Sequence, residues 1–255
     1  MEGWHGWDEY APFYDWENKR TVGRQDVTFW MDLAARIGVP VLELGCGTGR
    51  ISLPVARKVG QFVGVDRSGE MLRRLSQRFR RAKLGQGVSL VRGDIRALPF
   101  RKRHRFKLVM APYGIVQSLL RDKDVTDTFE CVAKSVSRGG VFAIDLVPDL
   151  PRWKEYERRI SLRGIGPNGG RLKLIETVRQ DPVKRLTIFD QEFVEQKAKV
   201  KKVYNFSIAF RTLTVPQVTR RLEQSGFRVD AVLGDYRGTA WSVDADVWVI
   251  IARRI

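Results

Sequence analysis

The sequence is poor in the residues that form cross-links and metal sites. Its 255 residues include two cysteines, Cys46 and Cys131, and two histidines, His5 and His104. Two cysteines cannot build a disulfide scaffold, and no Cys-x-x-Cys spacing or cluster of histidine with cysteine is present to bind zinc. We therefore expect a reduced protein without a metal site.

Long apolar segments are absent as well. The longest strongly apolar run, Val247–Ala252, is far too short to span a membrane. Near the N-terminus, Glu2, Asp8 and Glu9 stand among aromatic residues, without the basic-then-apolar order of a signal peptide. These absences predict a soluble, cytoplasmic protein with no membrane partner.

Positive charge, by contrast, is abundant. The chain has 46 basic and 29 acidic residues, a formal net charge of +17, and such an excess suggests a nucleic-acid partner. Much of it lies on the predicted helix 69–83, outside the apolar stripe, and in the run Arg101–Arg105, where we expect a solvated surface. A later group could bind RNA phosphates, an anionic small substrate or only water: Lys197, Lys199, Lys201 and Lys202.

The order of apolar runs divides the chain into four parts. Residues 1–38 carry an aromatic-rich lead and a helical pattern, which we expect to form a lid and a helix. From 39 to 150, short apolar runs alternate with amphipathic helices, which predicts an α/β fold with a mainly parallel sheet. Long alternating segments over 151–212 predict an inserted antiparallel sheet, and residues 213–255 return to the α/β pattern.

The periodicity also predicts the bounds of the elements. In the α/β part we expect strands at 39–44, 62–66, 88–93, 106–111, 141–146, 227–233 and 247–252, and helices at 48–59, 69–83, 125–136 and 215–225. In the insert we expect strands at 160–165, 171–180, 185–195 and 198–210.

A glycine-rich loop follows the first predicted strand of the α/β part. Glu43 is followed by Gly45, Gly47 and Gly49 at alternate positions, directly before a helix. A dinucleotide-binding loop needs its third glycine one residue later, where Arg50 stands, and the Gly-Lys-Ser/Thr of a P-loop is missing. The loop lies at the carboxyl end of a strand, where open α/β sheets bind ligands, although a tight turn without a ligand is the alternative.

The acidic-x-Gly-x-Gly-x-Gly pattern resembles motif I of the class I S-adenosylmethionine-dependent methyltransferases. The resemblance implies a Rossmann-like sheet of seven strands with the last one antiparallel, and S-adenosylmethionine as the cofactor. It also implies cofactor contacts from the loop residues Glu43, Gly45, Cys46, Gly47, Thr48 and Gly49.

Two acidic residues follow the next strands. Asp66 ends the second strand at the distance from the glycines expected of an acid that accepts ribose hydroxyls, with Arg67 beside it, although a helix N-cap is the alternative role. The segment from Gly93 to Phe100 resembles the family pattern G-D-[AI]-x-x-L-P-F. That resemblance implies that Asp94 and Ile95 flank the adenine, whereas a solvated turn is the alternative.

Two further segments resemble motifs of the same family. Ala111 and the residues after it occupy the place of motif IV, which implies a cofactor contact from Ala111 and substrate contacts from Tyr113 and Gln117. This segment lacks the [DN]-P-P-[YF] pattern of enzymes that methylate amines of nucleic-acid bases. The lead from Tyr10 to Asp15 resembles the Y-x-x-F-Y-D lid pattern, which makes Tyr14 a cofactor contact and the candidate catalytic residue, unless these aromatics only pack.

The sequence thus predicts a methyltransferase that transfers a methyl group to nitrogen or oxygen of a small molecule by in-line displacement. In such a reaction the protein mainly aligns and desolvates the reactants. Tyr113, Asp145 and Tyr236 are further possible bases. The alternatives are an RNA methyltransferase that uses the basic surface, and a non-catalytic cofactor- or partner-binding protein with this fold. The insert is expected to cover the substrate or to form a homodimer contact.

Overall fold

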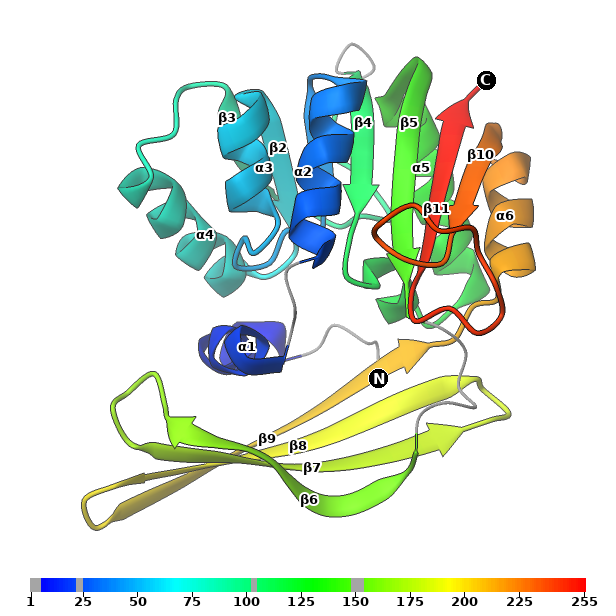
Figure 1. The fold of residues 1–255 in the computed structure, drawn as a ribbon. Helices are drawn as coiled ribbons and strands as arrows, with labels where there is room; N and C mark the ends of the chain where they lie inside the picture. The colour runs from blue at the N-terminus through cyan, green and yellow to red at the C-terminus, as the bar shows by residue number, and fades with distance from the viewer. Residues whose placement is uncertain (1–5, 22–24, 102–104, 148–153) are drawn as a thin grey trace.

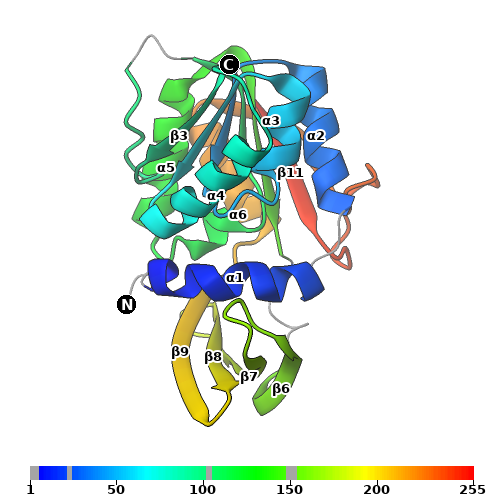
Figure 2. The same ribbon diagram turned by 90° about the vertical axis from the view of Figure 1, so that its left-hand side faces the viewer.

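The computed structural model describes residues 6–21, 25–101, 105–147 and 154–255, and it arranges them as an α/β core and a separate antiparallel sheet (Figure 1). Both histidines, His5 and His104, lie outside the described residues. Helix α1 (Trp7–Thr21) lies between the two sheets (Figure 2). No helix among the described residues is long and apolar enough to cross a membrane.

The core sheet has seven strands in the order β10-β11-β5-β4-β1-β2-β3. Strand β11 runs antiparallel to both neighbours and the other adjacent pairs are parallel, so the expected Rossmann-like sheet is confirmed. The strand bounds are β1 Val41–Leu44, β2 Phe62–Asp66, β3 Val88–Arg92, β4 Phe106–Ala111, β5 Val136–Leu146, β10 Phe227–Leu233 and β11 Trp248–Arg254.

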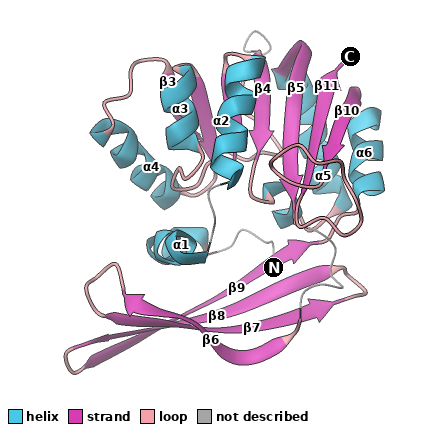
Figure 3. Ribbon diagram, viewed as in Figure 1, coloured by secondary structure: helices cyan, strands magenta, loops and turns pink. Residues whose placement is uncertain are grey.

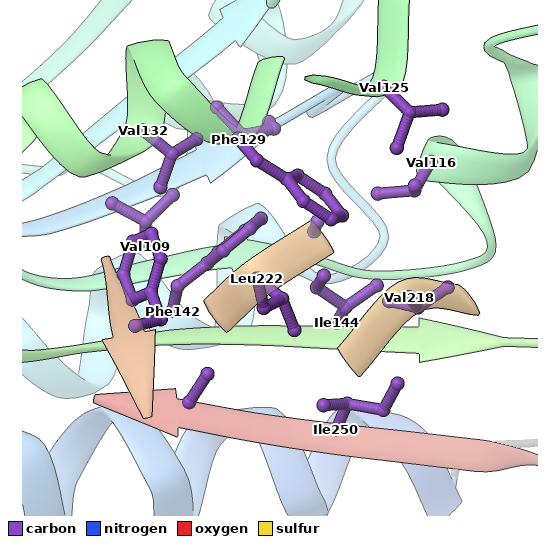
Figure 4. Packing of buried hydrophobic residues seen from close by; sticks show 14 of the residues in the cluster. Val109, Val116, Val125, Phe129, Val132, Phe142, Ile144, Val218, Leu222 and Ile250 are labelled. Atoms are coloured by element: carbon purple, nitrogen blue, oxygen red, sulfur yellow. The ribbon is translucent and has the colours of Figure 1, made fainter. Parts of the chain in front are cut away.

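Helices cover both faces of this sheet (Figure 3). On one face, Phe129 and Leu222 from two helices pack with Phe142 and Ile144 of β5 (Figure 4). Each such side chain contributes about 1.5–3 kcal/mol when it is fully buried. With both faces covered, the carboxyl ends of the strands remain the edge where a ligand can enter. The helix bounds are α2 Gln25–Ile37, α3 Ser52–Val59, α4 Gly69–Arg81, α5 Asp122–Ser135 and α6 Val215–Gln224.

Several element boundaries differ from the prediction, and the starts of α3 and β5 have an identifiable structural cause. Helix α3 begins at Ser52 rather than at residue 48, because Gly47 and Gly49 take positive φ angles of 51° and 91° and prolong the loop. Strand β5 begins at Val136 rather than at residue 141, and a register shift against β4 accommodates the additional residues. Both differences come from local backbone irregularities that hydrophobic periodicity does not report.

The insert is an antiparallel meander of β6 Tyr156–Ile165, β7 Arg171–Asp181, β8 Leu186–Lys197 and β9 Val200–Arg211, as expected. Its inner face packs against α1, where Phe13 stacks on Phe193 with ring centroids 4.6 Å apart. The buried members of this cluster are Tyr10, Ala11, Phe13, Trp16, Leu172, Leu174 and Phe193, with Met71 of α4. The aromatic lead is therefore a packing stripe that fixes α1 on the insert.

The Gln117 side chain joins both ends of the insert to the core by hydrogen bonds. It lies on the short helix η1 (Ile115–Ser118) and is 4% exposed. Its amide nitrogen donates to the carbonyl oxygens of Val147 and Arg211, each at 3.2 Å, and its amide oxygen accepts from the Val147 N–H at 2.8 Å. Val147 follows β5 and Arg211 ends β9, so one side chain links the segments that leave and re-enter the core.

Gln117→Leu leaves these three backbone groups without their partner. We expect the free energy of unfolding to fall by about 1–3 kcal/mol, the usual penalty for buried unpaired polar groups. Urea denaturation measures this loss. Gln224→Leu, at an exposed position of α6, is the control and should change the free energy by less than about 0.5 kcal/mol. Equal effects of the two substitutions would contradict this role.

A buried pair of carboxyl groups lies where α1 meets the insert. The Gln191 amide nitrogen donates to Glu17 and to Glu176, each at 3.0 Å, and so lies between the two carboxyl groups. The hydroxyl of Tyr10 donates to Glu17, and that of Tyr156 donates to Glu176. Burial, with Glu176 nearby, raises the pKa of Glu17 from 4.5 to about 6. The contact between α1 and the insert therefore favours the protonated form of Glu17.

The raised pKa of Glu17 predicts that the stability of the contact between α1 and the insert depends on pH. The protonated Glu17 stabilises the fold fully below about pH 4.5, and this contribution is lost as pH rises through about 6. The wild type should therefore lose on the order of 2 kcal/mol relative to Glu17→Gln across that window. Urea denaturation at several pH values tests this, with Glu157→Gln on exposed β6 as control. A pH-independent difference would be evidence against it.

Candidate cofactor site

A cleft of about 450 Å³ lies at the carboxyl ends of the parallel strands, next to α1. Twelve of the residues expected at the site line it: Tyr14, Glu43, Gly45, Cys46, Gly47, Thr48, Gly49, Asp66, Arg67, Asp94, Ile95 and Tyr113. Ala111 and Gln117 do not line the cleft. Ala111 is fully buried in β4, and Gln117 holds the insert.

The glycine loop packs tightly on one side and is open on the other. A Cβ atom at Gly45 would lie 2.5 Å from Ile115, and one at Gly49 would lie 2.1 Å from Leu75, so larger residues do not fit there. At Gly47, whose φ angle is +51°, the nearest atom would be the Gly45 carbonyl oxygen at 4.0 Å. The backbone at Gly47 therefore leaves room for a ligand to approach closely.

Glu43 is a buried acid with an unused acceptor. It is 2% exposed, and its Oε2 atom has no hydrogen-bond partner among the residues the structure describes. Burial raises the pKa of Glu43 to about 8. A buried carboxyl oxygen without a partner is costly, so its presence in the cleft wall favours a ligand that brings a donor or a positive charge.

Asp66 links the glycine loop to the loop before α4. Its two carboxylate oxygens accept the Gly47 N–H at 2.7 Å and the Ser68 N–H at 2.9 Å. The Ser68 hydroxyl accepts from the Met71 N–H at 3.1 Å, so Ser68 caps α4 and Asp66 is not needed as the N-cap. Each oxygen of Asp66 retains a second lone pair that can accept a ligand hydroxyl.

Asp94 is engaged by two arginines. Arg96 contacts it at 2.8 Å and Arg67 at 3.2 Å, and Arg96 also reaches Asp124 at 3.1 Å. Burial opposes ionisation of Asp94, but the hydrogen bonds from Arg96 lower its pKa below the usual value. The expected adenine contact would therefore have to share this carboxylate with two guanidinium groups.

Helix α1 contacts the core through polar side chains. The Asp15 carboxylate accepts from the Thr48 hydroxyl at 2.6 Å and pairs with Arg78 at 2.7 Å. Tyr14 lines the cleft, and burial raises its pKa well above the usual value. Its hydroxyl therefore stays protonated near neutral pH and is poorly suited to act as a base.

Arg50 is a cleft residue that the sequence did not assign. It pairs with Asp26 through both terminal nitrogens, and its guanidinium lies 5.0 Å from the centre of the Tyr113 ring. Its position directly after the glycine loop was the available signal. Arg50 places a positive charge in the cleft beside the glycine loop.

The turn after β4 is held by a buried acid. Tyr113 has an unusual positive φ of 61°, and Asp145 accepts from the next N–H, that of Gly114, at 2.8 Å. The Tyr236 hydroxyl donates to the other oxygen of Asp145 at 2.8 Å. Asp145 is 1% exposed and does not line the cleft, so it positions the turn and cannot meet a substrate directly.

Apolar side chains from three parts of the chain complete the cleft wall. Trp7 comes from α1, Ile115 and Leu119 from the segment after β4, and Phe210 from the insert. Nothing in the sequence indicated that Phe210 lines the cleft, because its position depends on how the insert packs against the core.

Comparisons with known proteins agree with this geometry. Residues 41–140 match a family model described as a methyltransferase domain. Over 117 residues, the chain is 32% identical to a 2-phytyl-1,4-naphtoquinone methyltransferase of Nostoc sp., which covers 42% of the chain and 50% of that protein. Over 112 residues it is 30% identical to a demethylmenaquinone methyltransferase of Lactobacillus johnsonii, covering 41% and 46%. The chain thus spans about half the length of these curated relatives.

Solved structures match over nearly the whole chain. An S-adenosylmethionine-dependent methyltransferase from Clostridium acetobutylicum has a TM-score of 0.78 at 17% identity, covering 97% of this chain and 98% of that one. CalS10, an amino pentose methyltransferase from Micromonospora echinaspora solved with S-adenosylmethionine bound, has a TM-score of 0.71 at 18% identity, covering 95% and 96%. The expected resemblance is confirmed: residues 41–140 match the methyltransferase-domain model, and the chain has the fold of the class I S-adenosylmethionine-dependent methyltransferases.

Proposed function

We propose that this chain is an S-adenosylmethionine-dependent methyltransferase that transfers a methyl group to nitrogen or oxygen of a small molecule. The observation that carries the proposal is the convergence of the glycine loop, Asp66 and the unpartnered oxygen of Glu43 in one cleft next to the lid. The match of residues 41–140 to a methyltransferase domain supports the same reading.

The residues of the cleft fit the groups of this cofactor. Glu43 offers its unused oxygen to the ammonium group, whereas the Arg50 guanidinium in the cleft wall is already paired with Asp26. Asp66 would accept the ribose hydroxyls, with Asp94 and Ile95 beside the adenine. Gly47 leaves the backbone open to close approach.

When bound, the cofactor supplies an electrophilic methyl group for in-line displacement. The task of the chain is then to align the acceptor and exclude water. Trp7, Leu119 and Phe210 provide apolar walls for this, and Tyr113, which also lines the cleft, would face the acceptor. Buried Tyr14 would act by packing and hydrogen bonding, since its raised pKa keeps the hydroxyl protonated.

The surroundings of the cleft favour a small acceptor over RNA. Helix α1 and strand β9 both contribute to its wall, so an acceptor must fit between the core and the lid. The arginines nearby are largely paired with acids: Arg73 and Arg74 with Glu70, Arg78 with Asp15, and Arg96 with Asp94. Paired arginines are less available to phosphates. The relatives named for quinones and the neighbour named for an amino pentose support a small-molecule acceptor, whereas one shorter match, over 83 residues, is to a 23S rRNA methyltransferase of Xylella fastidiosa.

Asp66→Ala tests the cofactor site. We expect S-adenosylmethionine binding, measured by calorimetry, to weaken at least about tenfold, because the ribose would lose a charged acceptor. Asp66→Asn keeps the side-chain shape and should give an intermediate loss. Asp127→Ala on the exterior of α5 should bind like the wild type. Unchanged binding by Asp66→Ala, or no binding by the wild type at high micromolar cofactor, would refute the proposal.

Proton release on binding tests the role of Glu43. With a pKa of about 8, Glu43 is mostly protonated in the free protein at pH 7. A neighbouring ammonium would lower that pKa, so binding should release part of a proton at pH 7 and much less above about pH 9. Calorimetry in buffers with different ionisation heats measures the release. Glu43→Gln should abolish it, and a wild type without buffer dependence at pH 7 would contradict this role.

A further inference from the structure

The outer face of the insert, turned away from α1, carries clustered cations. Leu172 and Leu174 are buried toward α1, so the side chains that alternate with them on β7 point outward. Residues paired directly across an antiparallel sheet share a face. Two adjacent rows of such pairs form what we call the basic array: Arg163, Lys173, Val194 and Val203, then Ile165, Arg171, Gln196 and Lys201.

The four cations of the basic array have no acidic partner within it. Arg163 stands directly opposite Lys173, and like charges in that position repel. Further along the same face each arginine is paired, Arg158 with Glu192 at 3.5 Å and Arg179 with Asp190 at 2.7 Å. No ion pair joins Arg163, Arg171, Lys173 or Lys201 to any acid in the described part of the chain. The four cations of the array are therefore available to bind an external anion.

Exposed aliphatic side chains accompany these cations. Ile165 is 60% exposed and Val203 is 46% exposed within the array, and Val200 at the adjoining β8–β9 turn is 58% exposed. The same turn carries further exposed lysines, which extend the positive surface: Lys197, Lys199 and Lys202. No aromatic residue belongs to either row of the array.

We propose that the basic array docks the protein on a membrane surface that contains anionic lipids. Lysine and arginine near such a surface are attracted to the headgroups, and exposed aliphatic side chains gain by entering the interface. Single-stranded nucleic acids are bound by aromatic stacking platforms, which this face lacks, and exposed valine or isoleucine adds nothing to phosphate binding. The combination on this sheet therefore favours lipid over RNA.

This docking is peripheral and uses side chains of a folded sheet. It differs from the expectation from the sequence that the protein has no membrane partner, which rested on hydropathy. Hydropathy detects spanning segments and does not detect a mixed basic and aliphatic sheet face. It is independent of the proposed methyl transfer, because no residue of the array lines the cofactor cleft.

Sedimentation with vesicles tests the proposal. The full chain is mixed with vesicles of phosphatidylglycerol and phosphatidylcholine, and separately with vesicles of phosphatidylcholine alone. We expect binding to the anionic vesicles only, weakened by salt. A variant with Arg163, Arg171, Lys173 and Lys201 changed to Glu should lose binding at least about tenfold. A control with the same change of charge on the core, at Lys58, Arg80, Lys134 and Arg220, should retain most of it.

A second variant separates lipid from soluble anions. Ile165→Ser combined with Val203→Ser keeps every charge, so it should bind vesicles more weakly while its thermal unfolding and cofactor titration stay near those of the wild type. No wild-type binding to anionic vesicles, or equal losses in the array and control variants, would overturn the proposal. So would binding of a labelled RNA that only the array variant loses, or a dimer in solution that the array variant dissociates.

Discussion

The two-sided contact of α1 is the interaction on which the cleft depends. One side of the helix buries aromatic rings in the insert, and the other makes polar contacts with the glycine loop and α4. The carboxyl edge of the parallel sheet would otherwise be open to water. The Gln117 side chain hydrogen-bonds to both ends of the insert. These bonds fix the position of α1 and β9 over the carboxyl edge of the sheet.

Charge is distributed unevenly in this strongly basic chain. The cleft gathers five acidic residues, Asp8, Glu9, Glu43, Asp66 and Asp94, together with four arginines, Arg50, Arg67, Arg92 and Arg96. A ligand that carries both positive and negative groups suits such a cleft. The unpaired positive charge lies elsewhere, most clearly on the outer face of the insert. The chain thus has a cleft of mixed charge and, separately, a basic surface on the insert.

The local sequence pattern predicted most of the features that depend on neighbouring residues alone. The alternation of strands and helices, the glycine loop and the acids after β2 and β3 all lie where spacing indicated. Arg50, Phe210 and Gln117 were missed or misassigned because their positions depend on contacts between distant segments. The sequence left open whether Lys197, Lys199, Lys201 and Lys202 bind RNA, an anionic small substrate or only water. No lysine among the described residues lines the cleft, and Lys201 lies on the outer face. The direction in which the β8–β9 hairpin points cannot be read from its own residues.

The most direct test of the central claim is to follow a labelled methyl group. The protein is incubated with S-adenosylmethionine carrying a labelled methyl group and with a cell extract, and the products are separated into small molecules, RNA and protein. The account predicts label in the small-molecule fraction, and strongly reduced label with the Asp66→Ala variant. Label in the RNA or protein fraction, or no transfer to any fraction, would contradict it.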